Sequence, residues 1–121
     1  MSKKSELSKD LAIIDAVPGV LTSTAEALHI KTLVGREALR VALANVILID
    51  RKQQDYGSGN IAKFGEFGCI VRMSDKFERI VNLMKHRRGK PVNESILDSY
   101  RDFSNYGILA TLVALGLWPR E

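Results

Sequence analysis

Cysteine, histidine and proline are all scarce in this sequence, and each shortage excludes a class of protein. The 121 residues include one cysteine, Cys69, so the chain cannot build an internal disulfide framework or a zinc site of several thiolates. The two histidines, His29 and His86, are too far apart to predict a histidine-rich metal cluster. Three prolines and nine glycines exclude a collagen-like or linker-dominated chain. We therefore expect a compact protein of a reducing compartment, the cytoplasm.

Long hydrophobic runs are also missing. The longest apolar run, 106–118, is well short of the roughly 20 residues that a membrane-spanning helix needs. No apolar segment follows the N-terminal lysines, so no signal peptide is expected. Lysine and arginine number 18 against 14 aspartates and glutamates, a formal net charge of +4. Such a mild excess is compatible with nucleic acid, with free nucleotides or with no charged partner. Because no run is long enough to span a bilayer, no membrane is expected as a partner.

Apolar residues recur at helical spacing, and no segment alternates as a strand does. The spacing predicts short helices over 5–17 and 22–30 and long helices over 36–54, 66–86 and 94–117. We therefore predict a single all-α domain, a bundle of three long helices, in which 1–35 is an N-terminal extension and 36–118 is the core. The segments 36–54 and 106–118 are more apolar than three helices can cover, which predicts that a homo-oligomer completes the bundle.

Two polar stripes mark the last two long helices. Helical spacing places on one stripe Arg72, Asp75, Arg79 and Asn82, and on the other Glu94, Asp98, Asp102 and Asn105. Carboxylates that share a face repel one another, so partial burial requires something that neutralises them. Arg72, Lys76 and Arg79 can pair with Asp98 and Asp102, or Mg²⁺ can bind among Asp75, Glu94, Asp98 and Asp102. The two arrangements can coexist, and a plain solvated face is the third alternative.

Two further charged segments flank these helices. The segment 51–57 is an ordinary helix C-terminus or a site in which Asp55 and Tyr56 contact a base or sugar and Lys52 lies near phosphate. The segment 85–90 is a solvated loop or an anion contact. No aromatic residues interleave with its basic side chains, which argues against a platform that stacks single-stranded nucleic acid, and nucleic acid is not the expected partner.

Four short motifs follow one another in the sequence: Asp55-Tyr56-Gly57, then 72–79, 94–98 and 102–106. On these motifs, residues 45–112 resemble the nucleotide modification associated domain 1 family, which is found largely in phages and bacteria. That family is distantly similar to the all-α nucleoside triphosphate pyrophosphatases of the MazG and dimeric dUTPase type. Those enzymes hold Mg²⁺ with acidic residues on two helices. The resemblance implies a nucleotide ligand and a magnesium site made by Asp75, Glu94, Asp98 and Asp102.

The chain departs from those enzymes on the first metal helix, where Lys76 and Arg79 accompany Asp75. This departure implies that cationic side chains hold the phosphate directly. The resulting set of ligand-binding residues is Lys52, Asp55, Tyr56, Arg72, Lys76, Arg79, Asn105 and Tyr106.

We therefore expect a phage-type nucleotide-binding protein that either hydrolyses or only holds a nucleoside phosphate. The first form is a magnesium-dependent pyrophosphohydrolase that serves nucleotide modification or pool control. The second is a non-catalytic protein that sequesters a nucleotide, such as a viral sponge for a host signalling nucleotide. A nucleic-acid-binding or structural role for the loop 85–90 is the remaining alternative.

Overall fold

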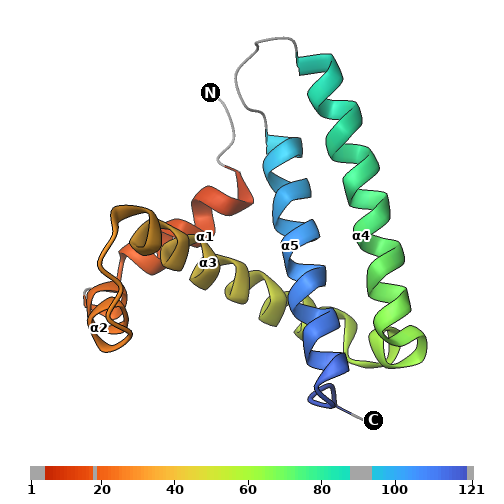
Figure 1. Cartoon of the computed structure of the whole chain (residues 1–121), viewed down its shortest axis with the longest axis horizontal. Coiled ribbons are helices and arrows are strands. Elements are labelled where there is room, and N and C mark those ends of the chain that lie inside the picture. Colours follow the sequence, from red (N-terminus) through yellow and green to blue (C-terminus); the bar gives the residue numbers. More distant parts are fainter. Residues whose placement is uncertain (1–4, 18, 88–93, 120–121) are drawn as a thin grey trace. The chain divides into compact units, whose positions relative to one another are not determined.

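The computed structural model describes residues 5–17, 19–87 and 94–119 (Figure 1). These residues form helices and no strand, which confirms the predicted all-α class. The helices are α1 (Glu6–Asp15), α2 (Val20–Ala27), α3 (Leu33–Tyr56), α4 (Gly59–Arg87) and α5 (Glu94–Ala114). Within the described part of the chain, no helix is both long enough and apolar enough to span a membrane. Contacts between residues divide the chain into unit 1, Met1–Arg51, and unit 2, Lys52–Glu121. The single-domain arrangement remains a prediction.

Two acid–arginine pairs join α1 to α3 in unit 1. Each oxygen of the buried Asp10 carboxylate accepts a hydrogen bond from a guanidinium nitrogen of Arg51 at 3.1 Å. The two oxygens of Asp15 accept hydrogen bonds from guanidinium nitrogens of Arg40 at 2.8 and 2.7 Å. Such two-pronged contacts fix direction as well as distance, because the planar guanidinium matches the carboxylate. Ser5 caps α1 by accepting a hydrogen bond from the Ser8 backbone N–H at 3.0 Å.

The start of the second helix differs from the prediction. Gly19 precedes α2 with a φ of 88°, and the helix begins at Val20 rather than after a Thr22 or Ser23 cap. Glycine adopts a left-handed backbone conformation easily, so the chain can turn at Gly19 and begin α2 without a side-chain cap.

Unit 2 is built on an antiparallel pair, α4 and α5, which run side by side in Figure 1. The less exposed side chains of α4 recur at a spacing of three and four residues, which places them on one face of the helix. Among them are Cys69, Met73, Lys76, Ile80 and Leu83. Cys69 and Ile96 are fully buried, and the rings of Phe77 and Phe103 lie 6.5 Å apart. Cys69 is therefore a core residue, as predicted.

The turn between α3 and α4 is held by polar contacts. Gly57 ends α3 in the left-handed conformation, with a φ of 69°. The following residue, Ser58, is buried: its carbonyl accepts the Trp118 indole N–H at 3.0 Å and its hydroxyl accepts from the Gln53 side-chain amide. These contacts fix the position of Ser58, the residue that precedes α4.

A break inside α4 was not predicted. Gly65 has φ 62° and ψ −153°, so 59–64 forms a short first segment and 66–87 forms the long helix. The prediction placed the start of this helix at Glu66 and treated 58–60 as loop. Backbone angles of this kind are essentially restricted to glycine, which explains why the break falls at this residue.

Candidate functional site

One carboxylate in unit 2 is shared by two lysines. Asp102 on α5 lies 3.0 Å from Lys76 Nζ through one oxygen and 3.3 Å from Lys52 Nζ through the other. We call these three residues the Asp102 cluster. The Asp102 side chain is 17% exposed, against 31% for Lys76 and 48% for Lys52. The cluster therefore carries one surplus positive charge, and its two cations remain accessible to solvent.

The same region of α4 carries a further cation. Arg72 precedes Lys76 by four residues, so their side chains are neighbours on the helix surface. Arg72 is exposed, and within the described residues its side chain has no ion pair or hydrogen-bond partner. Arg72 and the Asp102 cluster together have two more positive than negative charges, an arrangement that attracts an anion.

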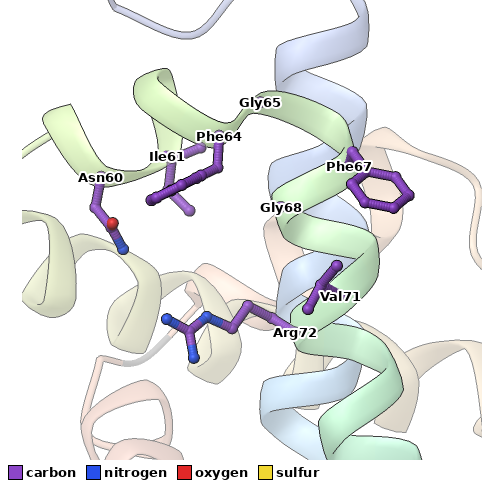
Figure 2. A pocket seen from close by; sticks show the side chains of 8 residues that line it. All are labelled: Asn60, Ile61, Phe64, Gly65, Phe67, Gly68, Val71 and Arg72. Carbon is purple, nitrogen blue, oxygen red and sulfur yellow. The ribbon is translucent and has the colours of Figure 1, made fainter.

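A pocket of about 460 Å³ opens beside Arg72 at the break in α4. We call it the kink pocket; it is lined by Asn60, Ile61, Phe64, Gly65, Phe67, Gly68, Val71 and Arg72, all of them in unit 2. Figure 2 shows the side chains of Asn60 and Arg72 extending into the same space from the two segments of α4, while the ring of Phe67 points away. The lining is thus mainly apolar, with one amide and one guanidinium.

Two glycines shape the kink pocket. Gly65 provides the backbone angles that turn the short segment away from the long helix. A Cβ placed on Gly68 would lie 2.5 Å from the Cβ of Phe64, so only glycine lets Phe64 come this close to the long helix. The ammonium of Lys63 lies 5.4 Å from the centre of the Phe64 ring, within the range of a cation–π contact.

The predicted ligand-binding residues are brought together only in part. Lys52 and Lys76 meet at Asp102, and the pair of Lys76 with Asp102 is one of the pairings that the sequence left open beside a magnesium site. Arg72 lines the kink pocket. The other predicted ligand-binding residues differ from one another in how exposed they are. Asp55, Tyr56 and Arg79 are exposed, Tyr106 is half-buried and Asn105 is buried.

The predicted magnesium ligands have different surroundings. Asp75 is exposed and Asp98 is half-buried, whereas both oxygens of Asp102 face lysines. Glu94 begins α5, but its side chain lies outside the described residues, as do Arg88 and Lys90 of the predicted basic loop. Among the side chains that are described, no three acidic, histidine or cysteine residues gather closely enough to hold a metal ion. The magnesium site remains a prediction.

Sequence reasoning missed the kink pocket. Its signal is the stretch Phe64-Gly65-Glu66-Phe67-Gly68, in which two aromatic residues each precede a glycine. Glycine lowers the stability of a helix interior, so two glycines near the start of an otherwise amphipathic helix indicate a backbone requirement.

Comparison of the chain with protein-family models, with curated proteins and with solved structures finds no significant match. The resemblance described above therefore rests on its four motifs alone.

Proposed function

We propose that unit 2 binds a nucleoside phosphate, with Arg72, Lys76 and Lys52 holding the phosphate groups. The observation that supports this proposal most directly is the pairing of two accessible lysines on one carboxylate, one helical turn from an exposed arginine. Phosphate groups carry several negative charges and accept several hydrogen bonds at once, which suits a group of closely spaced cations.

The exposed ends of the Asp102 cluster allow it to exchange partners. Ion pairs between solvent-exposed side chains contribute about 0–1 kcal/mol to stability. Lys52, the more exposed of the two lysines at 48%, can therefore turn toward an arriving phosphate at a small cost, while Lys76 stays paired with the partly buried Asp102. Asp102 meanwhile keeps the lysines close together when no ligand is bound.

Holding the ligand is the form of this function that the contacts favour over hydrolysis. In the enzymatic form, water would attack the α–β phosphate link and release a nucleoside monophosphate and pyrophosphate. Mg²⁺ bound by Asp75, Glu94, Asp98 and Asp102 would polarise the phosphate. In this structure the carboxylate of Asp102 is already neutralised by two lysines. A sequestering protein needs no metal-bound water, and the role in nucleotide pools follows from the motif resemblance.

A thermal-shift screen of the whole chain separates these forms. Nucleoside mono-, di- and triphosphates are each tested with Mg²⁺ and with EDTA, and each stabilising ligand is then recovered by chromatography. A ligand at a hundredfold excess over its Kd should stabilise the folded chain by about 2.7 kcal/mol. Recovery of an intact ligand supports a binding protein, and magnesium-dependent recovery of a monophosphate supports the hydrolase. Failure of every nucleotide to stabilise the chain contradicts the proposal.

We further propose that the chain forms a homodimer through α4. An exposed apolar stripe follows this helix at the three- and four-residue spacing of a helix–helix seam. It consists of Phe67, Ile70, Phe77 and Met84, which are about half exposed or more, together with the half-buried Val81. If each of the four exposed side chains buries about 100 Å², taken as half of an aromatic residue's area, and Val81 about half as much, the two copies together bury about 900 Å². That is about the minimum for a specific interface.

A further inference from the structure

We infer that the kink pocket is the subsite for the base of the nucleoside phosphate. This inference rests on the proposed function, and it assigns the apolar half of the ligand to residues that the phosphate proposal does not use. Phe64, Ile61 and Val71 supply apolar surface, and Asn60 and Arg72 supply the only polar side chains of the lining. A flat heteroaromatic ring with an attached anion matches that combination.

The size and openness of the kink pocket suit a small ligand. Its volume of about 460 Å³ lies within the range of roughly 300–1,000 Å³ that is usual for small-molecule sites. The Phe64 side chain is 59% exposed although it lies against the helix at Gly68. The close approach at Gly68 holds the Cβ of Phe64 near the long helix, and the exposed ring is available to stack on a base.

Arg72 connects the kink pocket to the Asp102 cluster. It lines the pocket, and it is also the helical neighbour of Lys76, whose ammonium lies on Asp102. A ligand whose base lies against Phe64 can therefore present its phosphate groups first to Arg72 and then to the lysines. A single turn of α4, from Arg72 to Lys76, therefore separates the apolar kink pocket from the cationic Asp102 cluster.

Asn60 gives the kink pocket a polar group that can hydrogen-bond to the edge of a base. Its amide offers one acceptor oxygen and a donor NH₂ group, and it points into the space that Arg72 also enters (Figure 2). A base edge that offers an adjacent donor and acceptor can pair with both, as adenine does with asparagine in nucleic-acid complexes. ATP, which joins such a base to phosphate groups, is therefore the probe for this subsite.

Calorimetric titration tests the assignment by separating the base from the phosphates. The full chain, Phe64→Leu and the control Phe77→Leu are each titrated with ATP and with tripolyphosphate in EDTA. Phe77 is a similarly exposed phenylalanine of α4 outside the kink pocket. Loss of one stacked ring should weaken ATP binding about tenfold in Phe64→Leu, whereas tripolyphosphate binding should be unchanged. Phe77→Leu should bind both ligands as the original chain does.

The alternative outcomes separate the two proposals. Equal ATP affinity in Phe64→Leu and the original chain overturns the base subsite and leaves phosphate binding intact. An equal loss for ATP and tripolyphosphate also overturns the subsite, since it shows a general disturbance of the site. If the original chain binds neither ligand, the proposed function is overturned, and the base subsite with it. Circular dichroism of each variant confirms that the helices are retained.

Discussion

Asp102 pairs with two lysines, and this makes it the most informative single residue of the proposed site. Its oxygens lie 3.0 and 3.3 Å from the ammonium nitrogens of Lys76 and Lys52. Asp102→Asn keeps the shape of the side chain but leaves both lysines without a carboxylate. One negative charge within about 5 Å of a bound phosphate contributes roughly 0.8 kcal/mol of repulsion in water. We expect the variant to bind a nucleoside triphosphate about fourfold more tightly in EDTA.

The control for Asp102→Asn is Asp75→Asn, because Asp75 is an exposed acid of α4 with no ion pair among the described residues. Its affinity in EDTA should stay close to that of the original chain. The gain in Asp102→Asn should also fall as salt rises, since exposed charges are screened within about 3 Å at 1 M. A loss of affinity in EDTA would mean that Asp102 supports the site in another way.

At the scale of elements, Gly65 allows α4 to be two segments rather than one. Its φ of 62° and ψ of −153° are strained for any residue with a Cβ, at a cost of about 1–3 kcal/mol. Gly65→Ala should therefore lower the midpoint of thermal unfolding and reduce ATP affinity, since the kink pocket depends on this turn. Gly59→Ala is the matched control: a Cβ there meets no atom within 4 Å, and its φ is not positive.

Gly59→Ala should leave the unfolding midpoint unchanged or raise it slightly, because alanine is the better helix former. Equal midpoints for the two variants, measured by circular dichroism, would contradict the role given to Gly65.

Burial of Cys69 between α4 and α5 can be followed through its thiol. Burial, together with a smaller effect of the Glu66 carboxylate, raises the pKa of this thiol above its ordinary value of 9.0. The folded state therefore favours the protonated thiol, and its contribution to stability is present below pH 9 and declines as the pH rises further. At pH 8 we expect reaction with a thiol reagent to be much slower in the folded chain than in denaturant. Equal rates would show that the thiol is accessible.

The all-α class and the long helices could be predicted because their apolar residues repeat with the helical period. The pairing of Lys76 with Asp102 could also be predicted, since a partly buried carboxylate needs a cation. The position of Lys52 in the same cluster depends on how the end of α3 meets α5, and periodicity carries no such information. The kink pocket was missed for a similar reason. It depends on the backbone angles of Gly65 and on a close approach at Gly68, which composition alone does not specify.

At the scale of the whole molecule, the apolar stripe of α4 predicts a dimer. Ile70 is 52% exposed near the N-terminal end of the stripe. Ile70→Glu places a charge in the proposed interface, and burial of an unpaired charge is strongly unfavourable. Light scattering coupled to size exclusion should give a dimer for the original chain and a monomer for the variant.

Asn82→Glu is the control for the dimer, since Asn82 is exposed and lies about 120° around the helix from Ile70. It should remain dimeric. A mass of 13.5 kDa for the original chain at micromolar concentration would contradict the interface.

The central claim is that one nucleoside phosphate binds unit 2 at the kink pocket and the Asp102 cluster together. Its most direct test is a titration of the ¹⁵N-labelled full chain with ATP, followed by amide chemical shifts. We expect saturable shifts concentrated at 59–76, at Lys52 and around Asp102, with the amides of α1 and α2 little changed. Shifts confined to α1 and α2, or no saturable shifts at millimolar ATP, would contradict it.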